Sequence, residues 1–172
     1  MSDLYIKTAQ SSYISRTANL LAPTVLQVGA SCIIHDGATI HGPNVTKIAS
    51  HVTLGNNVNL VGSSSVGSSS IQSSIGSHTI IHSGTTSRAA SIGSSCVIGA
   101  NCTLGESAII EDGVYLLPDS SVPENAFFPT RAVVGGRPAR IIDIMADGVE
   151  DERREMLEDM YKDFVYELNN TA

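Results

Sequence analysis

The amino-acid sequence predicts an all-β fold, a parallel β-helix with one C-terminal α-helix, and two observations support this prediction. The first is a six-residue repeat: between Ile92 and Val134 every sixth position holds a large aliphatic or aromatic residue. A period of six is a multiple of the two-residue strand period and does not fit a 3.6-residue helix, so it predicts short strands joined by tight turns. The second is an apolar stripe at helical spacing over residues 149–168.

Three hexads are expected to form one triangular coil, with the large residue inside and a small or β-branched residue four positions later near the corner. The large residues of the regular run are Ile92, Ile98, Leu104, Ile110, Leu116, Val122, Phe128 and Val134. The same period extends upstream to Val28, with a two-residue slip at Gly42–Pro43. A serine-rich stretch at 63–74 blurs it, and we expect ordered coils there rather than a flexible linker. About six coils result.

The chain divides into a β-helix with an N-terminal cap over residues 1–142 and an acidic helical segment over residues 143–172. The stripe that predicts the helix consists of Leu157, Met160, Tyr161, Phe164 and Leu168. Twenty residues at a rise of ~1.5 Å span ~30 Å, and six coils spaced ~4.8 Å apart span about the same length. The helix is therefore expected to run back along one face of the prism, antiparallel to the stacking of the coils.

Charge and composition exclude several classes of function. The net charge of −7 lies entirely within residues 143–172, so the prism itself is neutral. A neutral prism with an acidic tail predicts neither nucleic-acid binding nor adhesion to anionic lipid. No apolar run approaches the ~20 residues that span a bilayer, and residues 1–10 show no secretory signal. Cys32, Cys96 and Cys102 fall on small inward positions, which predicts buried free thiols and a cytoplasmic protein.

Outward-facing residues suggest where the protein makes contacts. The residue before each core residue should point outward, and residues 18 apart should stack on one face. Two faces are apolar, and a single helix can cover only one of them. We therefore expect one face to contact a partner protein: Ile109, Phe127 and Phe128, or, if the helix covers that side, Val97, Tyr115 and Val133.

The five histidines, His35, His41, His51, His78 and His82, are the residues best suited to chemistry. Zinc would need three converging ligands at ~2 Å. An acyltransferase would need one histidine as general base, and such enzymes commonly carry an extruded loop, which the regular run lacks. The sequence therefore predicts surface histidines, with no catalytic residue, metal or cofactor.

The repeat resembles the left-handed hexapeptide-repeat proteins, which implies a left-handed parallel β-helix. These proteins include CoA-dependent acyltransferases and γ-class carbonic anhydrases. The γ-class metal site uses a histidine pair one residue further apart than His78 and His82, and an Arg-Gly-Asp turn, where this chain has His41-Gly42-Pro43. The segment 134–140 resembles the glycine-proline turn that ends many hexapeptide domains, and we expect it to lead into the helix.

Both ends of the chain resemble the dynactin subunit 5 family more specifically. The segments that carry the resemblance are Leu4-Tyr5-Ile6-Lys7, Ile33-Ile34-His35-Asp36-Gly37-Ala38-Thr39-Ile40, Leu116-Leu117-Pro118-Asp119-Ser120-Ser121-Val122-Pro123 and Met160-Tyr161-Lys162-Asp163-Phe164. The resemblance implies a non-catalytic scaffold of the pointed-end complex in microtubule-based transport, associated with the cytoskeleton. Its partners would be a second β-helical subunit, an actin-related protein, and motor adaptors or cargo. The alternative is a homotrimeric hexapeptide acyltransferase or a γ-class carbonic anhydrase-like enzyme.

Overall fold

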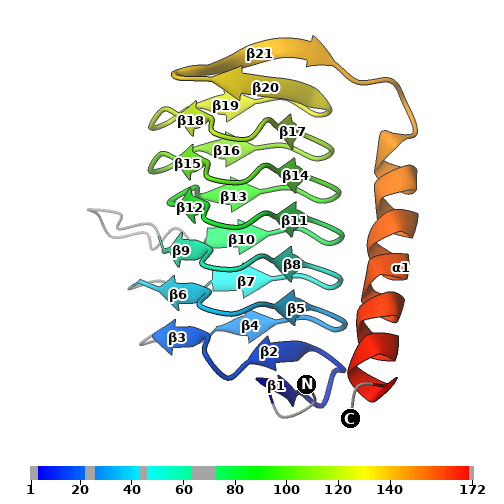
Figure 1. Ribbon diagram of the computed structural model, residues 1–172. Coiled ribbons are helices and arrows are strands. Elements are labelled where there is room, and N and C mark those ends of the chain that lie inside the picture. The colour runs from blue at the N-terminus through cyan, green and yellow to red at the C-terminus, as the bar shows by residue number, and fades with distance from the viewer. Residues whose placement is uncertain (1–3, 22–25, 43–45, 63–72, 171–172) are drawn as a thin grey trace.

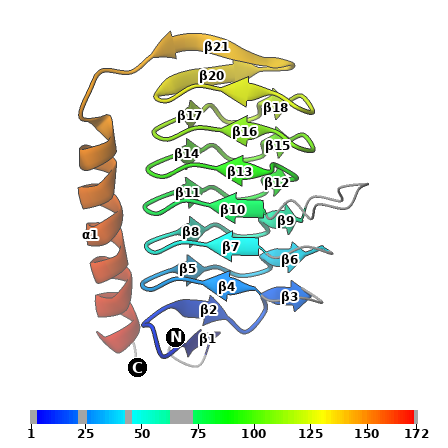
Figure 2. The same ribbon diagram turned by 180° about the vertical axis from the view of Figure 1, so that it is seen from behind.

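Three parallel β-sheets stack their strands coil upon coil and form a prism, with one long helix beside it (Figures 1 and 2). This computed structural model describes residues 4–21, 26–42, 46–62 and 73–170. The predicted hexapeptide β-helix is therefore confirmed. The serine tract, for which we expected ordered coils, lies mostly outside the described residues, at 63–72; only its end, Ser73 and Ser74, belongs to a described strand, β10.

Each coil contributes one strand to each sheet. Sheet A contains β1 (Tyr5–Lys7), β2 (Tyr13–Ser15), β5 (Ile33–Ile34), β8 (Thr53–Leu54), β11 (Ile80–Ile81), β14 (Val97–Ile98), β17 (Tyr115–Leu116), β20 (Ala132–Gly136) and β21 (Ala139–Ile144). Sheet B contains β3 (Asn19–Leu21), β6 (Thr39–His41), β9 (Asn59–Val61), β12 (Thr86–Ser87), β15 (Thr103–Leu104) and β18 (Ser121–Val122). Sheet C contains β4 (Gln27–Val28), β7 (Thr46–Ile48), β10 (Ser73–Ile75), β13 (Ser91–Ile92), β16 (Ile109–Ile110) and β19 (Phe127–Phe128).

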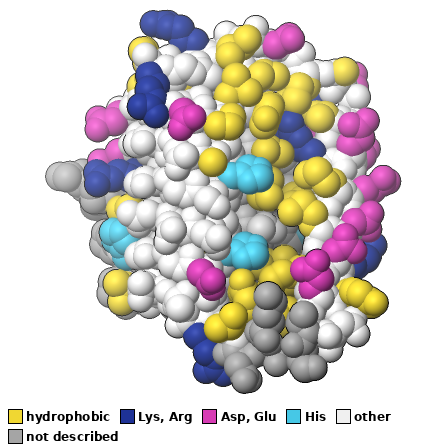
Figure 3. Space-filling model, viewed as in Figure 1, with side chains coloured by type: hydrophobic (Ala, Val, Ile, Leu, Met, Phe, Trp, Pro, Cys, Tyr) yellow, Lys and Arg dark blue, Asp and Glu magenta, His cyan; other side chains and the backbone are white. Residues whose placement is uncertain are grey.

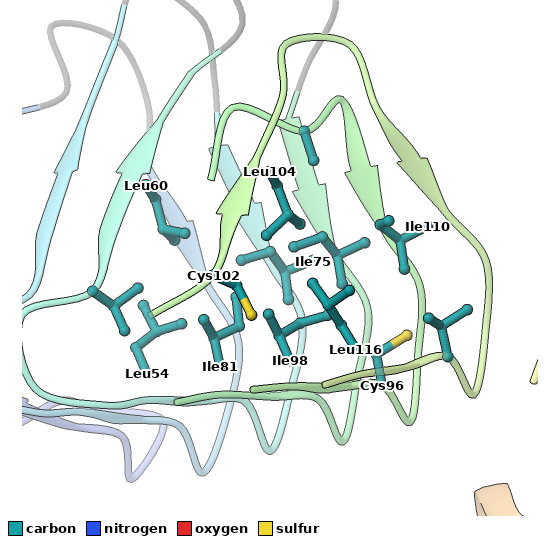
Figure 4. Close-up of a cluster of buried hydrophobic side chains, with 14 of the residues drawn as sticks. Leu54, Leu60, Ile75, Ile81, Cys96, Ile98, Cys102, Leu104, Ile110 and Leu116 are labelled. Atoms are coloured by element: carbon teal, nitrogen blue, oxygen red, sulfur yellow. The ribbon is translucent and has the colours of Figure 1, made fainter. Parts of the chain in front are cut away.

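The core is a stack of aliphatic side chains that point into the prism from all three sheets (Figure 4). Ile98, Leu104 and Leu116 have no exposed surface, and Val134 is equally buried. The six-residue period produces this stack because every sixth residue meets the axis from the next sheet, and residues 18 apart pair across coils, as Ile98 does with Leu116. The three cysteines also lie inside as free thiols. Burial raises the pKa of the Cys96 thiol to about 12.

The corner between sheets C and A carries one residue per coil in the left-handed backbone conformation. Ser31, His51, His78, Ser95, Gly113 and Arg131 occupy it with φ between 55° and 70°. We call this set the corner column. The left-handed conformation turns the chain sharply, but it brings Cβ too close to the following carbonyl oxygen. Glycine has no Cβ and avoids this clash, and short polar residues and histidine tolerate it best among the others.

Antiparallel strands close both ends of sheet A. Strand β1 pairs with β2 at the N-terminal end, and β20 pairs with β21 at the other end. The turn within 134–140 therefore makes a hairpin, and not the direct passage into the helix that we expected. Pairing the end strand with a neighbouring part of the chain satisfies amides and carbonyls that an open coil would leave unpaired.

Helix α1 (Val149–Asn170) begins at the predicted residue and runs antiparallel to the stacking of the coils along the corner column (Figure 1). Near its start, the buried Arg153 guanidinium donates hydrogen bonds from Nη1 to the carbonyl oxygens of Ser95 (2.7 Å) and Gly113 (2.5 Å). Just past its middle, the Tyr161 hydroxyl donates to the carbonyl oxygen of Ser11. These contacts fix the helix beside sheet A and leave the outer face of sheet C uncovered by it.

Candidate active site

A groove runs between helix α1 and the outer face of sheet A, in two parts that share Ile80, His82 and Met160. The larger part has a volume of about 440 Å³. The smaller part has a volume of about 240 Å³. Figure 3 shows the hydrophobic side chains of this face gathered in a band beside the helix, with histidines at its border.

The floor of the larger part is the outward row of sheet A. Ile80, Val97 and Tyr115 stack in successive coils because their strands pair in parallel register. Met156 and Met160 of α1 form the opposite wall, with 44% and 39% of their surface exposed. Long unbranched methionine side chains adapt to different apolar ligands. This part of the groove is therefore suited to a flexible apolar chain.

Polar groups line the smaller part. Its lining includes His35, Thr53, Asn56, His82 and Ser83, so hydroxyl, amide and imidazole groups face the same space. His82 stands at the junction of the two parts and is exposed. An exposed imidazole between an apolar and a polar compartment is in a position to exchange a proton with a ligand that spans both.

A glycine stands between His35 and His82 in the stack of sheet A. His35, Gly55 and His82 each follow the second residue of their strand, and these strands are stacked neighbours in sheet A. A Cβ on Gly55 would lie 2.7 Å from the backbone nitrogen of Ser83, which is closer than packing permits. Glycine is therefore required here by the close approach of the next coil, and no third side chain stands between the two histidines.

His35 is held in place more firmly than His82. Its Nδ1 lies 3.0 Å from the hydroxyl of Tyr5, and its ring meets the ring of Phe164 edge to face at 5.7 Å between centroids. Burial lowers the pKa of His35 below its ordinary value, with a smaller opposing effect from Asp36. The neutral imidazole is thereby favoured, so His35 can offer a hydrogen bond to a ligand in a fixed direction.

A second cluster lies at the corner column, where His51 and His78 stack and Glu158 of α1 approaches them. His41 lies apart from both groups, in strand β6 of sheet B. The sequence predicted surface histidines without chemistry, whereas the structure groups four of the five next to the helix.

The two predicted contact faces have different surroundings. On sheet A, Val97, Tyr115 and Val133 form the expected column, and each is half-buried on the side of the helix. Val97 and Tyr115 line the groove.

On sheet C, Ile109 and Phe127 are neighbours in register with 39% and 58% of their surface exposed. Phe128 is different: it is 6% exposed because the alternation of the strand points its ring into the core. It belongs to the interior stack and not to a contact surface.

The groove could not be predicted from the sequence, because it lies between helix α1 and sheet A and the position of the helix against the sheet was not known. Met156 lies outside the predicted helical stripe, and nothing in the sequence singles out Arg153, which is buried. Met160 belongs to the predicted stripe yet is 39% exposed, because it overhangs the groove rather than the core, and the stripe alone does not reveal this. No helix in the described part of the chain is long and apolar enough to span a membrane.

Comparison with known proteins shows the fold. No family model and no curated protein matches the chain. The structure resembles AntD, an N-acyltransferase from Bacillus cereus in complex with dTDP and 3-hydroxybutyryl-CoA, with a TM-score of 0.70 and 18% identity over 87% of this chain and 88% of that chain. A variant of AntD bound to dTDP-4-amino-4,6-dideoxyglucose and coenzyme A gives a TM-score of 0.71 and 18% identity over 86% and 88%. A second Bacillus cereus protein, assigned as an acetyltransferase, gives 0.52 and 16% over 94% of each chain.

These likenesses correct the family prediction. The solved structures described above are bacterial acyltransferases and not dynactin components, so the resemblance to dynactin subunit 5 is wrong. The predictions of a non-catalytic scaffold, of partners in the pointed-end complex and of a role on the cytoskeleton rested on that resemblance, and they are wrong with it. The hexapeptide β-helix, which rested on the repeat itself, is confirmed.

Proposed function

We propose that this protein is an acyl-CoA-dependent acyltransferase that uses the groove beside helix α1. The observation that carries the proposal is the junction at His82, where an apolar compartment meets a polar one. An acyl transfer can use this combination, because the donor brings an acyl group and the methylene carbons of the pantetheine arm, and the acceptor brings polar groups. The fold shared with AntD, whose complexes contain CoA compounds, supports the same reading.

The larger part of the groove would take the acyl group and the adjoining arm of the donor. Its volume of about 440 Å³ lies within the range of small-molecule sites, about 300–1,000 Å³. Val97, Tyr115, Met156 and Met160 offer apolar surface along both walls. Burying that arm would provide binding energy at about 25 cal/mol per Å² of apolar surface.

His82 would act as general base. Its imidazole accepts the proton of an acceptor amine or hydroxyl while the acceptor nitrogen or oxygen bonds to the thioester carbonyl carbon. The tetrahedral intermediate then collapses, the C–S bond breaks, and the same proton passes from the imidazolium to the leaving thiolate. The products are the acylated acceptor and free CoA, so the step needs no further reactant.

His35 would be a binding residue for the acceptor. Its contact with Tyr5 fixes the ring, and it lines the polar part of the groove together with His82, with Gly55 between them. The first acceptor to test is dTDP-4-amino-4,6-dideoxyglucose, because a structure of AntD contains it. Amino sugars and hydroxyl-bearing sugars attached to other nucleotides form the rest of the panel.

The test is release of CoA thiol, followed with a thiol reagent, from acetyl-CoA or 3-hydroxybutyryl-CoA in the presence of each acceptor. His82→Gln is expected to lower kcat by roughly 10²–10⁴-fold with acetyl-CoA affinity retained. Val97→Arg is expected to weaken acyl-CoA binding, since it places a charge on the apolar floor. His41→Gln is the matched control, because His41 lies on sheet B. Undiminished turnover in His82→Gln would refute the assigned role.

Two further properties remain our proposals. The exposed pair Ile109 and Phe127 on sheet C is the candidate contact surface for another protein chain. A cytoplasmic location is supported by the three free, buried cysteines, since free thiols are usual in a reducing compartment.

A further inference from the structure

A cluster of three metal-ligating side chains joins helix α1 to the corner column at mid-height of the prism. It consists of His51 on the turn between β7 and β8, His78 on the turn between β10 and β11, and Glu158 of α1. One ligand atom from each residue lies within 4.8 Å of the other two. The cluster is distinct from the groove, because none of the three residues is among the lining residues of either part.

The backbone places the two imidazoles in equivalent positions one coil apart. His51 and His78 both occupy the left-handed conformation of the corner column, with φ of 58° and 55°. Their rings stack with 4.6 Å between centroids and 7° between planes. Glu158 approaches from the helix, with Oε1 3.1 Å from Nε2 of His78. Two imidazoles and a carboxylate thus converge from three separate segments.

A second observation points to a ligand here. Nδ1 of His51 is buried and has no hydrogen-bond partner within the described ranges. An unsatisfied buried polar atom costs about 1–3 kcal/mol, so native structures seldom leave one without a protein group, a water or an ion. A cation bound to the ring would give this unpaired nitrogen, or the hydrogen-bonding group it carries, a defined role.

The chemistry of the three side chains suits a cation. The nitrogen of a neutral imidazole is the commonest metal ligand in proteins. The carboxylate adds the negative charge that a divalent cation needs.

We propose that His51, His78 and Glu158 form a binding site for a divalent transition-metal cation of the zinc type, which ties α1 to the third and fourth coils. Two histidines and one glutamate are a known zinc ligand set, with a water completing the tetrahedron. Ligand atoms around tetrahedral zinc at ~2.0–2.1 Å lie ~3.3 Å apart. The three ligand atoms here lie within 4.8 Å of one another, so the side chains need to close by up to about 1.5 Å and the two imidazole rings need to turn out of their stack. The bound ion would also fix the wall of the groove, because Met156 and Met160 flank Glu158 on the same helix.

The experiment uses the full chain without an affinity tag, stripped of metal with a chelator, and titrated with Zn²⁺ in a calorimeter. We expect one Zn²⁺ per chain and a rise in melting temperature on binding. His51→Ala, His78→Ala and Glu158→Gln should each lose more than about tenfold in affinity. Glu155→Gln, on the exposed side of the same helix, and His41→Ala are the matched controls and should bind as the unaltered protein does.

Two spectroscopic measurements use the unaltered protein and therefore do not depend on the folding of any variant. Co²⁺ added to the stripped protein should give the strong visible absorption of a tetrahedral nitrogen and oxygen site. Zn²⁺ should shift the imidazole ¹⁵N resonances of two histidines and leave the other three unchanged. The proposal is overturned if the unaltered protein takes up no Zn²⁺. It is equally overturned if Glu158→Gln, which folds as judged by circular dichroism, binds Zn²⁺ with unchanged stoichiometry and affinity.

Discussion

Replacing Arg153 by methionine should release helix α1 from the prism. Arg153 is 8% exposed, and its Nη1 donates to the carbonyl oxygens of Ser95 and Gly113 at 2.7 and 2.5 Å. Its guanidinium also lies over the ring of Tyr115 at 5.9 Å. Methionine keeps the apolar stem of the side chain but removes every donor, so both carbonyl groups lose their charged partner.

The magnitude follows from those two carbonyl groups. Each buried carbonyl that loses its partner costs about 1–3 kcal/mol. Water reaching the corner after the substitution recovers part of this cost. We therefore expect the free energy of unfolding of the helix to fall by about 2–5 kcal/mol in Arg153→Met.

The assay is urea denaturation followed by circular dichroism at 222 nm, where α1 supplies much of the signal. The matched control is Arg154→Met, since Arg154 is the adjacent residue, has 53% of its side chain exposed and forms an exposed ion pair with Asp151 at 3.4 Å. Exposed ion pairs contribute about 0–1 kcal/mol, so the control should change little. Equal losses in the two variants would refute the claim that Arg153 anchors the helix.

Three other predictions test the prism and its histidines. Phe128→Ala should lower the free energy of unfolding by about 3–5 kcal/mol, since the ring is 6% exposed, whereas Phe127→Ala on the outer face should lower it by less than about 0.5 kcal/mol. Similar losses in denaturant unfolding would contradict the assignment of Phe128 to the inner face and Phe127 to the outer face of the strand. Leu104→Asp should prevent folding, because it puts an unpaired charge at a position with no exposed surface, and a native circular dichroism spectrum would disprove this. Burial lowers the pKa of His35 and of His51 below 6.5, so at pH values below 6.5 the unfolded chain binds more protons than the folded chain. The free energy of unfolding should therefore decrease as the pH falls from 6.5 to the lower pKa values of the folded state. A free energy of unfolding that stays constant over this pH range would contradict the burial of both histidines.

The repeat determined the fold from sequence because it repeats one local rule. Ile98 and Leu116 point inward, and Val97 and Tyr115 stack outward, since strand alternation and an 18-residue coil leave no other arrangement. The helix was predictable for a similar reason, as its stripe repeats at helical spacing. Its position against sheet A was not, because two outer faces are apolar and the choice depends on contacts such as that of Arg153 with Ser95.

The two histidine clusters could not be predicted because the number of residues in each coil, which decides which residues pair between coils, is not apparent from the sequence. His51 and His78 are 27 residues apart, yet they occupy successive coils, as the pairing of Thr53 with Ile80 shows. A uniform 18-residue coil would have placed them on different faces. The resemblance to dynactin subunit 5 misled for another reason: hexads recur in many proteins with this fold, so matching residues report the fold rather than the function.

Calorimetric titration of the unaltered protein with acetyl-CoA tests the central claim most directly. We predict saturable binding, and we expect Val97→Arg, on the floor of the groove, to abolish it or to weaken it at least tenfold. His82→Gln should leave this binding intact while it lowers kcat of acyl transfer by roughly 10²–10⁴-fold. Absence of acetyl-CoA binding by the folded protein, or binding that Val97→Arg leaves unchanged, would contradict the assignment of the groove as an acyl-CoA site.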